Sequence, residues 1–279
     1  MPDTIDPAAA LRDLRAACPV VHNITNFVVM NSVANALLAL GASPIMAHAP
    51  EEMEEIVGIA SALALNIGTL DAAWTGSMLL AGQAAQRRGT PVVLDPVGAG
   101  ASTLRTDTAA RLMREVRPAL VRGNASELIA LAGALDAAPK ENEGHASASG
   151  SRGVDSTHSG HGLDAVAAAL ARRCGCVAVC SGETDIVSNG TRVARIRGGH
   201  ALMRQVTGMG CMATAIIGAF AAVRPPFEAA VCGMAAMKAA GGMAAQGAAG
   251  PGTLLVRFID ALYALDSAAL TAHARVEMD

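Results

Sequence analysis

The regular alternation of short apolar runs with helical stretches is the feature that most constrains the fold of this chain. Six mostly apolar runs are predicted to be strands, at residues 18–24, 43–47, 62–68, 91–98, 118–124 and 176–182. Strands that are apolar throughout need cover on both faces of their sheet. Because strands and helices alternate, we expect an α/β fold in which two helical layers enclose a mostly parallel sheet.

The segments between and after these runs have helical spacing. Thr106 is predicted to cap the helix that follows the fourth strand. Asn189–Gly190 predicts the turn of a β-hairpin over residues 184–199, and three helices are expected to close the chain. The expected helices cover residues 27–41, 51–61, 75–89, 106–116, 125–133, 162–175, 209–223, 226–247 and 253–265.

The chain is expected to form one domain over residues 1–279. Hydrophobic residues make up 52% of it and aromatic residues only 2%, so the core must be built from Ala, Val, Leu, Ile and Met. The sequence has no repeat of fixed period. Residues from about 137 to 160 lack a hydrophobic period and are predicted to form a mobile polar surface loop. Its histidines are irregularly spaced, which argues against a metal site there.

Charge and patterning argue against several classes of protein. A net charge of -3 and the scarcity of aromatic residues do not suit nucleic-acid binding. No apolar run is long enough to predict a membrane span, and the N-terminus does not resemble a signal peptide. The six cysteines lack the paired spacing of a zinc site. We therefore expect reduced thiols and a cytoplasmic protein.

Polar or glycine-rich clusters follow almost every predicted strand. In open α/β sheets, ligands bind beyond the carboxyl ends of the strands, so these clusters predict a binding site. Packing of the core alone does not predict this coincidence. The clusters are HNITN, MAH, NIGT, DPVG, RGN and SGE, and TGMGC follows the hairpin.

The TGMGC cluster, Thr207 to Cys211, precedes an apolar helix. Glycines at a helix start let backbone N–H groups bind an anion, as a phosphate-transferring site requires. The same field is expected to lower the pKa of the Cys211 thiol, which could then accept a proton from an alcohol. The alternative is that Cys211 is a small buried packing residue.

Asp95 and Glu127 follow neighbouring strands, and two carboxylates facing one pocket suit a hydrated Mg²⁺ beside nucleotide phosphates. Arg122 offers planar donors to a phosphate. The alternative for the two acids is turn formation and helix capping. Residues 98–103, GAGAST, contain part of a dinucleotide-binding pattern, but no helix is expected at the right distance, and the Walker pattern is absent.

Together these segments resemble the hydroxyethylthiazole kinase family of the ribokinase-like superfamily. The resemblance covers roughly residues 11–265 and implies a three-layer α/β/α sandwich without a separate lid domain. It also implies ATP-dependent phosphorylation of the hydroxyl of 4-methyl-5-(2-hydroxyethyl)thiazole in thiamine biosynthesis. The matching stretches are VHNITNFVVMNSVANALLALGASPIMA, LNIGTL, PVVLDPVGAG, REVRPALVRGNASE, GVDS, SGETDIV and VTGMGC.

The resemblance also implies a role for each matching residue. Cys211 stands where most ribokinase-like kinases carry an aspartate base. The remaining roles are substrate binding by Asn26, Met46 and Gly208, ATP binding by Arg122, Ser181 and Thr207, and Mg²⁺ association by Asp95 and Glu127.

A homotrimer with active sites shared between subunits is a further implication of the resemblance. Two other readings stay open. One is a related ribokinase-like enzyme, such as a hydroxymethylpyrimidine kinase or a nucleotide-repair dehydratase, although these carry an aspartate in place of Cys211. The other is a non-catalytic nucleotide-binding regulator on the same fold.

Overall fold

One nine-stranded sheet runs through the residues that the structure, a computed structural model, describes, namely 5–137 and 162–279. The strand order is β2-β1-β3-β4-β5-β6-β7-β8-β9; the first six strands are parallel, and β7, β8 and β9 are antiparallel to their neighbours. Except for residue 137, the predicted polar loop lies outside the described residues. The strands are β1 (Val20–Ile24), β2 (Ser43–Ile45), β3 (Ala62–Asn66), β4 (Val92–Asp95), β5 (Leu120–Asn124), β6 (Val177–Ser181), β7 (Asp185–Ser188), β8 (Val193–Gly198) and β9 (Ala274–Met278).

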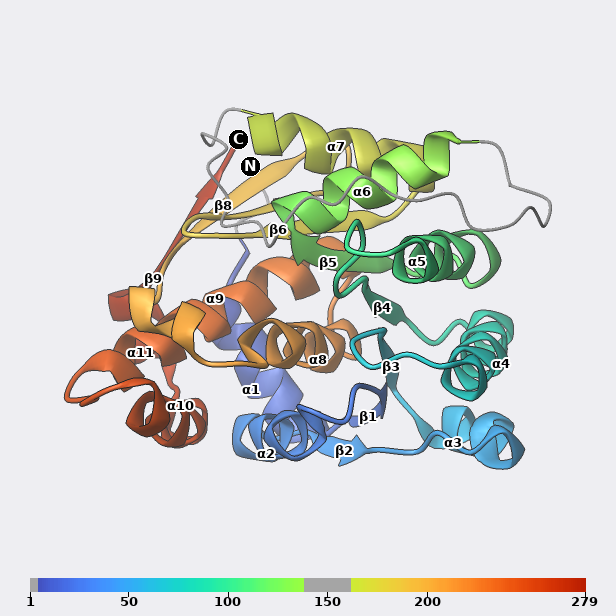
Figure 1. The fold of residues 1–279 in the computed structure, drawn as a ribbon. Coiled ribbons are helices and arrows are strands. Elements are labelled where there is room, and N and C mark those ends of the chain that lie inside the picture. Colours follow the sequence, from blue (N-terminus) through green and yellow to red (C-terminus); the bar gives the residue numbers. More distant parts are fainter. Residues whose placement is uncertain (1–4, 138–161) are drawn as a thin grey trace.

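Helices cover both faces of this sheet, and Figure 1 shows the two layers on opposite sides of the strands. Alternate strand residues enter different cores: in β4, Val93 packs into one cluster, whereas Val92 and Leu94 pack into the other. The predicted three-layer fold is therefore confirmed. One layer consists of α3 (Met53–Ile59), α4 (Ala72–Arg88), α5 (Thr103–Glu115), α6 (Ala125–Asp136) and α7 (Leu163–Cys174). The other consists of α1 (Pro7–Ala17), α2 (Met30–Leu40), α8 (Met209–Ala221), α9 (Pro226–Ala245), α10 (Pro251–Ala264) and α11 (Ser267–His273).

The start of α5 differs from the prediction. The helix begins at Thr103, because the Ser102 side chain accepts a hydrogen bond from the backbone N–H of Arg105 and so caps it. Thr106 lies inside the first turn and donates its hydroxyl to the Ser102 carbonyl instead. The helix therefore begins at the last residue of the GAGAST segment, three residues earlier than predicted.

Both ends of the chain contain elements that the periodicity did not predict. Near the N-terminus, the Asp6 side chain caps α1, whose Ala10, Leu11 and Leu14 are buried. Near the C-terminus, α11 and β9 follow the three expected helices. Because β9 pairs with β8, it extends the antiparallel end of the sheet. No helix of the described residues is long and apolar enough to cross a membrane.

The sheet brings the polar strand ends together. Asn66 is paired with Asp95 across β3 and β4, and Asn124 is paired with Ser181 across β5 and β6. Helix α8 packs on β1, β3 and β4, so its first turn lies beside these carboxyl ends. Gly208, the N-cap residue before that helix, has a φ of 87° in the left-handed region, where a side chain would be strained.

Candidate active site

Asp95 is the most buried carboxylate of the candidate site, with no exposed surface at the end of β4. Its Oδ2 atom accepts hydrogen bonds of 2.8 Å from Asn66 Nδ2 and of 2.8 Å from Thr214 Oγ1. Its Oδ1 atom has no hydrogen-bond partner within the described residues. Burial raises the pKa of Asp95 to about 6, and the opposing charge of Arg122 limits that rise.

A chain of side-chain amides connects Asp95 to Cys211. The Asn66 Oδ1 atom accepts a bond of 2.8 Å from Asn26 Nδ2, which also lies 3.5 Å from the Cys211 sulfur. Gly68 is required beside this chain, because a Cβ atom there would lie 2.5 Å from Asn26 Nδ2. The polar ends of β1, β3 and β4 thus form one hydrogen-bonded network with the start of α8.

The protonation of Cys211 differs from the sequence-based expectation. Burial and the nearby negative charge of Asp95 together raise the pKa of this thiol to about 11, although the hydrogen bonds from Asn66 and Asn26 lower it. The expectation that the helix start would lower this pKa was wrong, because burial and a neighbouring carboxylate outweigh the helix dipole. Cys211 is therefore a neutral thiol at physiological pH.

Arg122 lies against the first turn of α8. Its Nη1 atom is 3.9 Å from Asp95 Oδ2, and its Nη2 atom donates a hydrogen bond to the Ser181 hydroxyl. Gly210 makes this approach possible, since a Cβ atom there would lie 2.4 Å from Arg122 Nη1. No side chain of the described residues caps α8, so the first N–H groups of the helix remain available beside a guanidinium. Such an arrangement of donors can bind an anion.

Glu127 holds the loop after β4 to the start of α6. Its Oε1 atom accepts a bond of 2.8 Å from the backbone N–H of Gly98, and its Oε2 atom accepts one of 2.8 Å from that of Asn124. Asn124 in turn caps α6, and the two side chains form a capping box. The capping interpretation of Glu127 and Asn124 is therefore confirmed, and the carboxylate also raises the pKa of Asp95.

Met46 is half-buried and packs against the core cluster that contains Val29 and Val33. Two residues later, the ring of His48 stacks on Trp74 with centroids 4.1 Å apart. The Trp74 indole donates a bond of 3.0 Å to the Thr25 carbonyl, next to Asn26. The segment after β2 is thus linked to the segment after β1.

Thr207 and Gly208 lie in the turn before α8. Thr207 is exposed, and within the described residues no hydrogen bond joins it to the Asp95 network. Gly208 lies against α2, because a Cβ atom there would be 2.8 Å from Val29 Cγ1. The turn before α8 therefore contacts the start of α2.

The sequence interpretation missed two contributors. Asn66 ends its strand with the polar cluster NIGT, yet it received no role. Thr214 was not considered, although a lone hydroxyl residue in the apolar stretch MATAIIG was a usable signal. Both hydrogen bonds to Asp95 come from these two residues.

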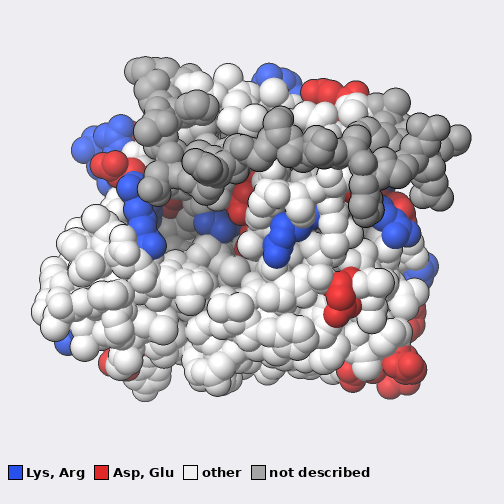
Figure 2. Space-filling model, viewed as in Figure 1, with Lys and Arg blue, Asp and Glu red and all other residues white. Residues whose placement is uncertain are grey.

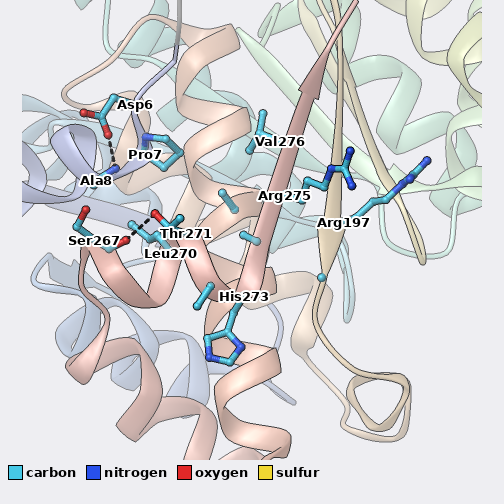
Figure 3. A pocket seen from close by; sticks show the side chains of 14 residues that line it. Asp6, Pro7, Ala8, Arg197, Ser267, Leu270, Thr271, His273, Arg275 and Val276 are labelled. Atoms are coloured by element: carbon cyan, nitrogen blue, oxygen red, sulfur yellow. Dashed lines mark hydrogen bonds between the residues drawn. The ribbon is translucent and has the colours of Figure 1, made fainter.

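A cavity of about 700 Å³ lies elsewhere in the molecule, between the start of α1, strands β8 and β9, and α11. Figure 3 shows Asp6, Ser267, Leu270 and Val276 around it, from both ends of the chain. None of the predicted site residues lines this cavity. The candidate active site therefore rests on the strand-end network and not on this cavity.

The fold is that of the ribokinase-like class of proteins. A solved pyridoxal kinase from Staphylococcus aureus, in complex with AMP-PCP and pyridoxal, superposes with a TM-score of 0.65 over 94% of this chain and 99% of that one. At 15% identity, this likeness shows the fold alone.

Closer relatives place the chain within that class. The model of the hydroxyethylthiazole kinase family matches residues 11–268. A hydroxyethylthiazole kinase from Nitratidesulfovibrio vulgaris (strain DSM 19637 / Miyazaki F) is 60% identical over 94% of both chains. The solved structure of a hydroxyethylthiazole kinase protein from Pyrococcus horikoshii OT3 is 37% identical, with a TM-score of 0.88 over 98% of both chains. The chain belongs to the hydroxyethylthiazole kinase family and is a kinase.

Proposed function

We propose that the protein transfers the γ-phosphoryl group of ATP to the primary hydroxyl of 4-methyl-5-(2-hydroxyethyl)thiazole, a step of thiamine biosynthesis and salvage. The observation that carries the proposal is the position of Arg122, between Asp95 and the uncapped first turn of α8. A guanidinium and backbone N–H groups that converge beside a buried carboxylate suit a transferring phosphoryl group.

The proposed roles divide the site residues between the two substrates. Asn26, Met46 and Gly208 bind the thiazole alcohol, and Arg122, Ser181 and Thr207 bind ATP. Asn26 is the residue that connects the two sides, since its amide contacts both Asn66 and Cys211. An alcohol that hydrogen-bonds to Asn26 therefore lies beside the first turn of α8, where the phosphoryl group is bound.

Cys211 contacts the substrate hydroxyl as a neutral group. A thiol with a pKa of about 11 is a poor proton acceptor at physiological pH. In a loose phosphoryl-transfer transition state, the attacking alcohol keeps its proton until late, so a strong base is unnecessary. The proton then passes to the transferred phosphoryl oxygen, and the proposed role of Cys211 is to orient the hydroxyl.

The residues present fit a Mg²⁺ ion. Asp95 offers a buried Oδ1 atom that has no hydrogen-bond partner within the described residues. Glu127 already accepts two backbone bonds, so we assign it a supporting role through ordered water. When bound, Mg²⁺ neutralises charge on the nucleotide phosphates.

We further propose that the chain acts as a single domain in a homotrimer. Figure 2 shows a broad area without charged side chains over α2, α8 and α10. Phe27, in the turn before α2, is 62% exposed, Leu38 in α2 is 59% exposed, and Val256 in α10 is 64% exposed. A trimer that buries this area beside Asn26 would place the active site at a subunit interface. Because ATP is the co-substrate, we expect the enzyme in the cytoplasm.

An assay of acceptor dependence tests the proposed function. Purified protein is mixed with Mg-ATP and the thiazole alcohol, and ADP release is followed together with the mass of the phosphorylated product. 5-Ethyl-4-methylthiazole is the matched control, because it lacks only the hydroxyl group. ADP release that requires the alcohol supports the proposal. Turnover with a hydroxymethylpyrimidine but not with the thiazole would favour the related kinase, and nucleotide binding without turnover would favour a regulator.

A further inference from the structure

Lys238 is a buried lysine that the proposed chemistry does not use. It lies in the middle of α9 and is only 7% exposed. Its Nζ atom donates hydrogen bonds of 2.8 Å to the Gly182 carbonyl and of 2.9 Å to the Glu183 carbonyl. A buried ammonium is costly unless its donors are satisfied, so this residue requires a structural or functional explanation.

Asp185 completes the surroundings of the ammonium. Its Oδ2 atom lies 3.3 Å from Lys238 Nζ, and its Oδ1 atom accepts a bond of 2.8 Å from the backbone N–H of Gly182. Burial raises the pKa of Asp185, and the charge of Lys238 opposes that rise. The turn between β6 and β7 is thus held at both its N–H and its carbonyl groups by one ion pair.

The same lysine also contacts the segment that leads to α8. A Cβ atom on Gly198 would lie 3.2 Å from Lys238 Cβ, and one on Gly199 would lie 3.2 Å from Lys238 Cδ. The chain between β8 and the turn before α8 therefore passes directly over the lysine stem. Both glycines have positive φ, at 134° and 73°, a conformation that residues with a side chain rarely adopt. This close passage therefore depends on glycine at both positions.

These contacts converge on the nucleotide side of the site. The turn that Lys238 holds begins next to Ser181, which accepts a hydrogen bond from Arg122. The segment that passes over the lysine continues to Thr207 and Gly208. One side chain on α9 thus links the two backbone segments that carry the proposed ATP contacts.

We propose that Lys238, paired with Asp185, is a positioning residue for the nucleotide end of the active site. It touches neither substrate. It holds the β6–β7 turn and the segment after β8 at a fixed separation, so that Ser181, Arg122 and Thr207 meet one nucleotide. The inference rests on the proposed function, because it assigns these residues to ATP.

The expected result is that the KM for ATP changes while the KM for the thiazole alcohol does not. Displacing one wall of a binding site by about 1 Å costs up to about 100-fold in rate. We therefore expect Lys238→Met to raise the KM for ATP by about 10-fold or more. The KM for the thiazole alcohol at saturating ATP should change less than about twofold, because Asn26 and Met46 follow β1 and β2, and Gly208 lies against Val29 rather than against Lys238.

The variants separate positioning from folding. Lys238→Met keeps the stem but leaves Asp185 as an unpaired buried charge, so it is compared with the double variant Lys238→Met/Asp185→Asn. In the double variant the amide oxygen can still accept from Gly182, and no charge remains. Met237→Ala is the matched control, because it opens a cavity in the same helix next to Lys238 and should leave both KM values unchanged.

Two further readouts decide the proposal. Hydrogen exchange of a peptide covering residues 181–185 should quicken in the double variant and stay slow in Met237→Ala. In Lys238→Ala, ethylammonium should restore part of the affinity for ATP, since it can occupy the truncated position. A double variant with wild-type KM for ATP and wild-type amide protection would overturn the proposal.

Failure of the proposed function has a different outcome. If the wild-type protein neither binds nor turns over ATP, the proposed function fails, while the exchange measurement still reports whether Lys238 holds the turn. If the wild type is active and the KM values of the variants rise equally for both substrates, only the inference about nucleotide positioning fails.

Discussion

Replacing Asp95 with asparagine should stabilise the protein while it removes activity. The carboxylate is fully buried, and its pKa is raised from 3.8 to about 6. Asparagine has nearly the same shape, and its Oδ1 atom can accept the hydrogen bonds that Asn66 and Thr214 now donate to the carboxylate. The substitution therefore removes a buried charge and keeps the bonds around it.

The size of the effect follows from the pKa. A shift of about two units corresponds to ~3 kcal/mol of lost stability once the carboxylate is charged. The new amide N–H₂ group takes the place of the Oδ1 atom, which has no partner in the described residues. Leaving that donor unpaired costs about 1 kcal/mol. We expect a net gain of about 2 kcal/mol, or a rise in Tm of roughly 4–8 °C.

The gain should depend on pH in a defined direction. Because the pKa is higher in the folded state, the native protein binds more protons than the unfolded chain between pH 3.8 and about 6. Wild-type stability should therefore fall as the pH rises through this window and level off above it. Asp95→Asn should be the more stable protein at about pH 8 and should lose that advantage at about pH 4.

Thermal unfolding of both proteins across this pH range is the assay. Asp260→Asn is the matched control, because Asp260 is an exposed carboxylate on α10, and its replacement should leave Tm unchanged at every pH. Activity is measured on the same samples and should fall at least about 100-fold in Asp95→Asn. A lower Tm at about pH 8, or an equal gain at both pH values, would refute the reasoning.

Three more substitutions test the site. Gly210→Ala should displace the Arg122 guanidinium and lower kcat/KM for ATP at least about 10-fold with little change in Tm, because the atom in the way ends a flexible side chain; an unchanged kcat/KM would contradict the contact. Cys211→Ala should lower kcat less than about 10-fold between about pH 7 and 9, because the thiol is already neutral there; a larger loss that grows with pH would make it a base. Thr214→Val removes a hydrogen bond to the Asp95 carboxylate and should shift the acid limb of the pH–rate profile to higher pH. An unchanged acid limb would show that Asp95 does not set it.

The fold could be predicted from the sequence because its determinants are local. Each buried strand is a short apolar run, and most helices have their own spacing, so the order of elements was readable without any long-range information. The exceptions are also physical. Helix α1 is marked mainly by the Asp6 cap, and β9 is recognisable only as the partner of β8, which no local pattern specifies.

The site residues could be named from the sequence, whereas their chemical states could not. Polar clusters at strand ends pointed to Asp95, Arg122 and Cys211, and the structure brings Arg122 to 3.9 Å from Asp95. The field of a helix start is a local property, and it predicted a lowered thiol pKa. Burial and the charge of Asp95 act across different elements, and they raise the pKa of Cys211 to about 11 instead.

The order of most strands and helices, the family resemblance and the residue types at the strand ends are all readable from the sequence. Which of these residues share a hydrogen bond depends on the folded chain, since Thr214 and Asp95 are 119 positions apart. Folding also places Lys238 under a turn more than 50 positions earlier in the chain. Hydrophobic periodicity is set by neighbours along the chain, whereas desolvation and charge pairing depend on distances that exist only after folding.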